Sequence, residues 1–138
     1  MKHKILIIDD NADLRGVVRN YLLMHDRTLE IFEASTGEMG VAKAACIFPN
    51  IVLVDFNLPN MNGLEATKHI KADNPRCNVI MLTMFEVDTL RKKASSAGVT
   101  EFIGKSEIHD RLMPVVRKCL ENSKSGERKS HENHQTQC

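Results

Sequence analysis

Several short apolar runs in this sequence end in a residue that could do chemistry. These residues are Asp9, Asp10, Asp55, Thr83 and Lys105. If they lie together, the carboxylates repel: two of them about 4 Å apart cost roughly 4 kcal/mol at an effective dielectric near 20. Lys105 supplies a single compensating charge. An all-oxygen ligand set favours a hard divalent cation, and we expect Mg²⁺ because the sequence has no long flexible calcium-binding loop.

A carboxylate beside Mg²⁺ and an ammonium group is suited to phosphoryl transfer. The metal and Lys105 would neutralise the equatorial oxygens of the phosphoryl group while a carboxylate oxygen attacks in line. Asp55 follows the apolar run at 51–54, which we expect to be the central strand of a sheet. It would then lie between the Asp9–Asp10 pair and Lys105. We therefore predict that Asp55 is the nucleophile that accepts the phosphoryl group.

Five apolar runs alternate with amphipathic stretches, which indicates a β-α unit repeated along the chain. Strands joined by helical crossovers run parallel, with right-handed connections. We predict an α/β fold, a three-layer α/β/α sandwich whose five-stranded parallel sheet has the flavodoxin-like order 2-1-3-4-5. The expected strands are 4–8, 29–32, 51–54, 78–82 and 100–104, and the expected helices are 12–25, 36–46, 63–72, 87–97 and one that ends near Asn122.

The ends of the expected helices carry their own signals. Asp13 could cap the first helix, and Gly98 is expected to close the helix at 87–97. If Asp110 caps the last helix, Pro114 falls in or just after its first turn, where a missing N–H group costs least.

The chemically able residues should meet because all strands of an open parallel sheet present their C-terminal ends at one edge. Each residue alone has a simpler interpretation: an aspartate after a strand often caps the next helix, Thr83 could do the same, and Lys105 could be a solvated surface charge. Their coincidence at the ends of four strands favours one shared site over four unrelated explanations.

Length and charge describe one domain with a polar end. The 138 residues suffice for a single domain, which we place at 1–122, followed by a flexible tail at 123–138. Before the tail, 16 basic residues balance 16 acidic ones, because three of the 19 basic and two of the 18 acidic residues lie within it. This balance gives no electrostatic footprint for nucleic acid, so we expect no direct nucleic-acid binding.

The sequence also favours a cytoplasmic location without a membrane partner. No apolar run is long enough to span a bilayer, and the one near the N-terminus is too short for a signal peptide. The four cysteines are widely spaced, which favours free thiols in a reducing compartment.

Four segments resemble the receiver domain of two-component response regulators, over about residues 3–122. "ILIIDDN" resembles the acidic pair of that family, "LVDFNLPNMNG" its phospho-acceptor strand and turn, "MLTM" its switch threonine and "AGVTEFIGKS" its lysine strand. The threonine–methionine pair, with Ser106 after the lysine, is most similar to receivers attached to helix-turn-helix transcription regulators. All four segments occur in the family's order and spacing.

The resemblance implies a phosphorelay role in which Mg²⁺ is the cofactor. Asp55 would accept a phosphoryl group from a phosphohistidine of a sensor histidine kinase or a phosphotransfer protein. Asp9, Asp10, Asp55 and the backbone carbonyl of Asn57 would hold Mg²⁺, with Asp9 acting partly through water. Such a domain is a phospho-acceptor rather than an enzyme, because it catalyses only its own phosphorylation and dephosphorylation.

The resemblance also implies a switch. Thr83 would bond a phosphoryl oxygen and Phe102 would swing inward, which would remodel the surface formed by the helix at 87–97, the strand at 100–104 and the last helix. A downstream protein or a second copy of the chain would dock there. Three positions depart from the common pattern. Met84 replaces a small residue and could narrow access to the phosphate, Ser106 replaces a proline after Lys105, and Asn62 replaces an aspartate in the turn.

Other interpretations remain open at this stage. The chain could be a stand-alone receiver or the N-terminal fragment of a DNA-binding transcription regulator. A phosphohydrolase of the haloacid dehalogenase type needs a second aspartate at position 57, where this chain has Asn57. A flavodoxin-like FMN carrier needs an electropositive phosphate loop, whereas the segment "DDNADLRG" is acidic.

Overall fold

A computed structural model of the chain describes residues 2–84, 92 and 96–125, and it contains the alternating elements that the sequence predicts. The strands are β1 (Lys4–Ile8), β2 (Glu30–Ala34), β3 (Ile51–Asp55), β4 (Asn78–Thr83) and β5 (Glu101–Gly104). The helices are α1 (Ala12–His25), α2 (Gly37–Ile47), α3 (Gly63–Asp73) and α5 (Ile108–Ser125), and a short 3-10 helix, η1 (Lys105–Glu107), precedes α5. Most of the helix expected at 87–97, and most of the tail expected at 123–138, lie outside the described residues.

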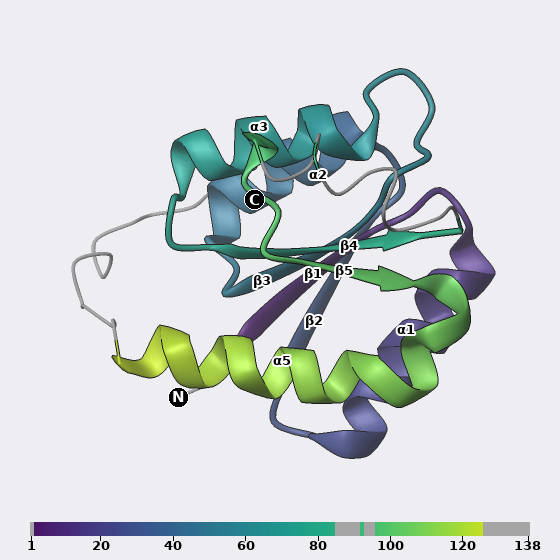
Figure 1. The fold of residues 1–138 in the computed structure, drawn as a ribbon, viewed down its shortest axis with the longest axis vertical. Coiled ribbons are helices and arrows are strands. Elements are labelled where there is room, and N and C mark those ends of the chain that lie inside the picture. The colour runs from purple at the N-terminus through teal and green to yellow at the C-terminus, as the bar shows by residue number, and fades with distance from the viewer. Residues whose placement is uncertain (1, 85–91, 93–95, 126–138) are drawn as a thin grey trace.

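The strands form one parallel sheet in the order β2-β1-β3-β4-β5, so the predicted topology is confirmed. Figure 1 shows the three layers: α2 and α3 cover one face of the sheet, and α1 and α5 cover the other. The side chains that bury each face come from alternate strand positions, because successive residues of a strand point to opposite faces.

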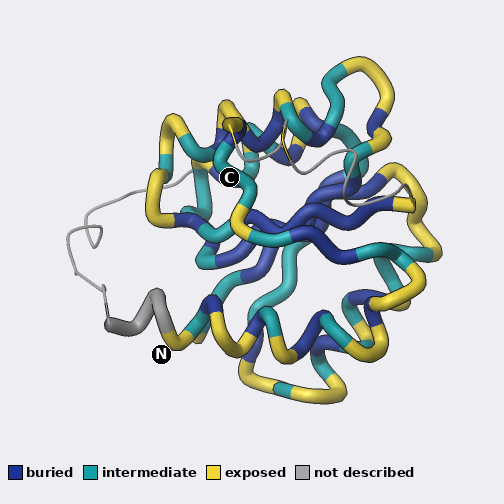
Figure 2. The backbone as a smooth tube through the Cα atoms, viewed as in Figure 1, coloured by how far each residue is buried: buried dark blue, intermediate teal, exposed yellow. Residues whose placement is uncertain are grey.

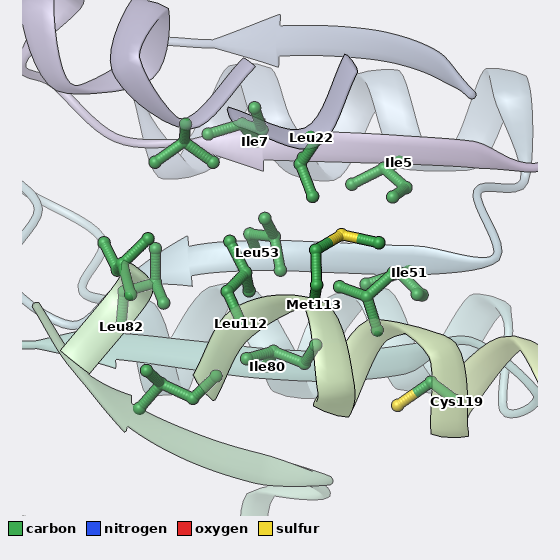
Figure 3. Packing of buried hydrophobic residues seen from close by; sticks show 14 of the residues in the cluster. Ile5, Ile7, Leu22, Ile51, Leu53, Ile80, Leu82, Leu112, Met113 and Cys119 are labelled. Atoms are coloured by element: carbon green, nitrogen blue, oxygen red, sulfur yellow. The ribbon is translucent and has the colours of Figure 1, made fainter. Parts of the chain in front are cut away.

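Two apolar clusters fill the spaces between these layers. One cluster joins Ile7, Leu53 and Ile80 of the sheet to Leu22 of α1 and Leu112 of α5, which point toward one another in Figure 3. The other cluster packs the alternate strand residues, on the opposite face of the sheet, against α2 and α3. In Figure 2 the strands form a buried centre, and the exposed turns lie on the helices and loops around it. The core therefore holds the strands rigidly, and their C-terminal ends with them.

The helix ends correct two predictions. Asn11, rather than Asp13, caps α1, because its side chain accepts a hydrogen bond from the Leu14 N–H. Asp110 does not cap α5: the 3-10 helix runs directly into α5 at Ile108, so Pro114 lies inside the helix. Gly98 has a φ of 97°, the left-handed conformation expected of a closing glycine.

The cysteines also depart from expectation at one position. Cys77 and Cys119 are buried free thiols, as predicted. Cys46 is disulfide-bonded, so the prediction of free thiols is wrong for this residue. Spacing along a sequence does not show which sulfurs a fold brings together. Among the described residues, no helix is both long and apolar enough to cross a membrane.

Candidate functional site

The register of the sheet places the strand ends side by side. Ile8 of β1 pairs with Val54 of β3, so the residues that follow them, Asp9 and Asp55, leave the sheet at the same level. Asp55 is also level with Leu82 of β4, next to Thr83. Thr83 in turn pairs with Gly104, which precedes Lys105. The predicted residues therefore leave the sheet at one edge.

Three carboxylates and one ammonium group meet at this edge. Each of Asp9, Asp10 and Asp55 offers an oxygen, and these oxygens all lie within 4.8 Å of one another. The Lys105 Nζ lies 3.2 Å from Asp9 Oδ2 and 3.2 Å from Asp55 Oδ1. Asp9 and Asp55 are only 2% and 5% exposed, whereas Asp10 faces solvent. The side chains of Asp9, Asp10, Asp55 and Lys105 converge as the sequence predicts, and Lys105 bridges the two buried carboxylates.

Asp9 is held by its backbone and by one of its oxygens. Its N–H donates to the Ala34 carbonyl (3.1 Å), and its carbonyl accepts from Arg15 Nη1 (2.7 Å). Oδ1 accepts from the N–H of Asn11 at 2.9 Å. Oδ2 is buried and has no hydrogen-bond partner among the described residues, so its approach to Lys105 is an ion pair without hydrogen-bond geometry. A buried oxygen in this state is a site at which a cation would bind favourably.

Asp55 is in an environment that disfavours its negative charge. Burial raises the pKa of the Asp55 carboxyl above its usual value, and the neighbouring charge of Asp9 raises it further. The ammonium of Lys105 and the N–H of Asn57, which donates to Oδ1 at 3.3 Å, oppose these effects without cancelling them. The same hydrogen bond places the backbone of Asn57 beside the acidic residues.

The loop between Asp55 and α3 is closed tightly around the site. The N–H of Gly63 donates to the Phe56 carbonyl (3.0 Å), and a Cβ atom on Gly63 would lie 2.5 Å from the Asp55 carbonyl oxygen. Only glycine fits this close approach. Asn60 adopts a φ of 66°, which asparagine tolerates better than most residues. The glycine of the "NMNG" turn is therefore required by the backbone beside Asp55.

Asn62, which stands where the family pattern often has an aspartate, has a defined structural role. Its side chain accepts a hydrogen bond from the N–H of Glu65 at 3.0 Å, and the Glu65 side chain accepts from the Asn62 N–H at 3.2 Å. This reciprocal pair is a capping box at the start of α3. An asparagine satisfies the cap as an aspartate would, so the substitution preserves the loop.

The expected switch residues lie at the other side of Asp55. Thr83 is buried at the end of β4, and Phe102 of β5 is buried in the apolar cluster on the α2 and α3 side. Met84, directly after Thr83, is 76% exposed. Asp55, Thr83 and Lys105 thus occupy three adjacent strand ends, whereas Phe102 lies within the sheet.

Two arginines that bind the backbone of predicted site residues were not themselves predicted from the sequence. Arg15 of α1 donates to the Asp9 carbonyl and pairs with Glu33 Oε1 of β2 at 2.9 Å. Arg111 of α5 donates to the Phe102 carbonyl at 3.2 Å and pairs with Glu101 Oε2 at 3.1 Å. Helical spacing alone shows neither contact, because each joins an arginine on a helix to a backbone carbonyl in a strand or directly after one.

The chemistry of the edge follows from its charges. Three carboxylates against one ammonium leave a formal excess of two negative charges, and two of the carboxylates are buried. Carboxylate oxygens are the ligands of hard divalent cations. The Asp9, Asp10 and Asp55 triad is therefore consistent with a metal site, and Asp9 Oδ2, which has no hydrogen-bond partner among the described residues, is an oxygen that such an ion could bind.

Comparison with known families agrees with the fold and the site. The model of the response regulator receiver domain matches residues 5–117. The chain therefore belongs to the response regulator receiver domain family. Members of this family act in two-component signalling and are generally phospho-acceptors rather than catalytic enzymes.

Individual relatives show how far the similarity extends. The response regulator protein VraR of Staphylococcus aureus is 34% identical over 118 residues, which are 86% of this chain and 56% of VraR. The chain thus matches about half the length of this relative. Its fold is similar to the receiver domain protein of Methanospirillum hungatei JF-1 (TM-score 0.85, 24% identity, 92% of this chain and 100% of the other). The receiver domain of AraT from Geobacillus stearothermophilus gives a TM-score of 0.82 at 27% identity, covering 93% and 100% of the two chains.

Proposed function

We propose that this chain is a phosphorylation-dependent signalling switch. Asp55 accepts a phosphoryl group from a phosphohistidine of a sensor histidine kinase or a phosphotransfer protein. The observation that supports this role most directly is the Lys105 Nζ, 3.2 Å from both Asp9 and Asp55 within the acidic triad. An ammonium so placed can bind a phosphoryl oxygen once the group is on Asp55. As is typical of receiver domains, the proposed place of action is the cytoplasm.

In the proposed reaction, an oxygen of Asp55 attacks the phosphorus and forms an acyl phosphate. The P–N bond of the phosphohistidine breaks, and its electron pair returns to the imidazole nitrogen, which takes up a proton. Asp55 must be ionised to attack. Its raised pKa reflects poor solvation of the carboxylate, so bond formation with phosphorus, which spreads the negative charge, is favoured. Lys105 holds the phosphoryl oxygens in place and offsets their charge.

We propose Mg²⁺ as the cofactor, held by Asp9, Asp10, Asp55 and the backbone carbonyl of Asn57. When bound, the ion would offset the negative charge of the phosphoryl oxygens. The chain's own part is to present ligands without rearrangement. The buried Asp9 is fixed by its contacts to Ala34, Arg15 and Asn11, and the exposed Asp10 would offer its carboxylate to an ion that arrives from solvent.

The proposed output is a change of surface on the side of Lys105. Thr83 would donate a hydrogen bond to a phosphoryl oxygen, and Phe102 would change its packing with it. The affected surface would comprise β5, α5 and the helix expected at 87–97, most of which lies outside the described residues. A downstream protein or a second copy of the chain would recognise that surface. The proposed receiver domain spans residues 1–122, and the proposed tail spans residues 123–138.

A second candidate is that the chain is the receiver part of a DNA-binding transcription regulator. The match to only 56% of VraR favours it. Measuring the mass of the protein isolated from its source cells with an antibody against this domain distinguishes the two. A mass near 15.6 kDa supports a stand-alone switch, and a much larger mass supports a longer regulator of which this chain is the receiver part.

The test of phospho-acceptance is intact mass after incubation with acetyl phosphate and Mg²⁺. We expect one added phosphoryl group on the native chain and none on Asp55→Asn. Asp13→Asn is the matched control, because Asp13 is an exposed aspartate in the first turn of α1 and outside the triad. Full labelling of Asp55→Asn, or loss of labelling in the control alone, would overturn the assignment.

A further inference from the structure

The backbone carbonyl of Asp9 is bound by a charged side chain that no step of the proposed reaction uses. Arg15 Nη1 donates to this carbonyl at 2.7 Å, a short charge-assisted hydrogen bond. The carbonyl belongs to the peptide that joins Asp9 to Asp10, two residues whose side chains contribute to the triad. A contact at this peptide can therefore set the position of both carboxylates.

Arg15 is itself fixed from the neighbouring strand. Its Nε donates to Glu33 Oε1 at 2.9 Å, and its side chain is only 17% exposed. Glu33 lies in β2, and its backbone carbonyl accepts from the Nζ of Lys43 at 3.1 Å. The guanidinium thus joins the C-terminal end of β1 to β2 through two directed contacts, and a planar fork can make both without rotating.

We propose that Arg15 is a positioning residue for the metal ligands Asp9 and Asp10. This inference rests on the proposed Mg²⁺ site and goes beyond it, because it assigns the geometry of the site to a residue that cannot itself bind a cation. Arg15 holds the Asp9–Asp10 peptide while the Asn11 N–H holds Asp9 Oδ1, which leaves Oδ2 directed at the shared site. Partners that orient a ligand in this way typically change metal affinity about tenfold or more when removed.

Positioning and simple electrostatics predict opposite results for Arg15. A positive charge near a cation site repels the cation, so removing the charge should tighten Mg²⁺ binding if charge were the only effect. If Arg15 positions the ligands, removing it should weaken Mg²⁺ binding in spite of the lost repulsion. The sign of the change in affinity therefore separates the two explanations.

The chain contains a matched control on the same helix. Arg19 lies one turn after Arg15 and pairs with the other oxygen of Glu33, at 3.6 Å. Its guanidinium contacts the Ile31 carbonyl at 3.5 Å rather than Asp9. Arg19→Gln removes an equal charge beside the same glutamate and leaves the Asp9 carbonyl contact intact.

The experiment is Mg²⁺ titration by isothermal calorimetry of the native chain, Arg15→Gln, Arg15→Met and Arg19→Gln. Urea unfolding of each variant confirms that it is folded. We expect the Mg²⁺ dissociation constant to rise about tenfold in both Arg15 variants and to stay within about twofold of native, or fall, in Arg19→Gln. Arg15→Lys, which retains the charge and one donor group, should recover part of the lost affinity.

Two further readouts exclude a general loss of structure. Amide hydrogen exchange of Asp10 and Asn11 without metal should become faster in Arg15→Gln, with exchange in β3 unchanged. With acetyl phosphate, the Mg²⁺ concentration for half-maximal phosphorylation should rise about tenfold, and the rate at saturating Mg²⁺ should stay within about twofold of native.

Each outcome decides the question. Equal or tighter Mg²⁺ binding by the Arg15 variants, while the native chain binds Mg²⁺, overturns the positioning role and leaves the proposed function intact. No Mg²⁺ binding by the native chain overturns both. Failure of Arg15→Gln and Arg15→Met to fold would make Arg15 a residue for folding and would also overturn the proposal.

Discussion

The middle of the sheet and its C-terminal edge are built from the same strands but differ in what burial costs them. In the first part of β3, Ile51 and Leu53 are fully buried among apolar neighbours, and their burial stabilises the fold. The same strand ends at Asp55, which is also buried and whose pKa is raised by that burial. Burial of apolar side chains thus stabilises the fold and offsets the cost of burying a carboxylate at an edge that can bind a cation.

The largest effect should come from the interior. Leu53→Ala removes a fully buried side chain and leaves a cavity, so we expect a loss of about 2–5 kcal/mol in the free energy of unfolding, measured by urea denaturation. Val17→Ala, at a position that is 60% exposed, is the control and should change it by less than about 0.5 kcal/mol. A small loss at Leu53 would mean that the strands are not held by this cluster.

Magnesium should stabilise the edge. Because the ion would bind the folded triad, Mg²⁺ at a hundred times its dissociation constant should raise the free energy of unfolding by about 2.7 kcal/mol. Asp10→Ala removes an exposed ligand and should abolish most of this gain while leaving metal-free stability close to native. Equal stabilisation of Asp10→Ala and the native chain would place the ion elsewhere.

A smaller effect is expected at the loop that leads away from Asp55. Asn62→Ala removes the capping box of α3 and should lower the free energy of unfolding by about 1 kcal/mol. Gly63 still fixes the approach to Asp55, so Mg²⁺ affinity should stay within about twofold of native. A large change in Mg²⁺ affinity instead would show that the cap, rather than Gly63, sets the loop.

The sequence was informative where one physical rule determined the outcome. Apolar periodicity located the strands, and the shared edge of a parallel sheet then required Asp9, Asp55 and Lys105 to meet. In the structure, the pairing of Ile8 with Val54 brings Asp9 and Asp55 to the same edge. Period-two and period-3.6 patterns carry this information because burial depends on the face of each element.

The sequence was uninformative where several local solutions are close in energy. Asn11 and Asp13 are both competent caps two residues apart, and only the structure shows that Asn11 is used. The start of α5 was misplaced because the 3-10 helix at Lys105 continues into it without a break. Arg15 was missed because its contact with the Asp9 carbonyl depends on how α1 packs against β1, which no spacing rule encodes.

The most direct test of the account is the stability of Asp55→Asn relative to native across pH, in metal-free buffer. The folded-state pKa of Asp55 is raised above its ordinary 3.8, so ionisation favours the unfolded chain. Below pH 3.8 the Asp55 carboxyl is protonated in both the folded and the unfolded chain, so the native protein and Asp55→Asn should be similarly stable. As pH rises from 3.8 through the raised folded pKa, native should lose stability relative to Asp55→Asn, which should be the more stable protein at pH 7, and Mg²⁺ should narrow or reverse the difference. An Asp55→Asn protein that is less stable than native at pH 7 without Mg²⁺ would contradict the claim that the edge holds a destabilising negative charge that a cation would offset.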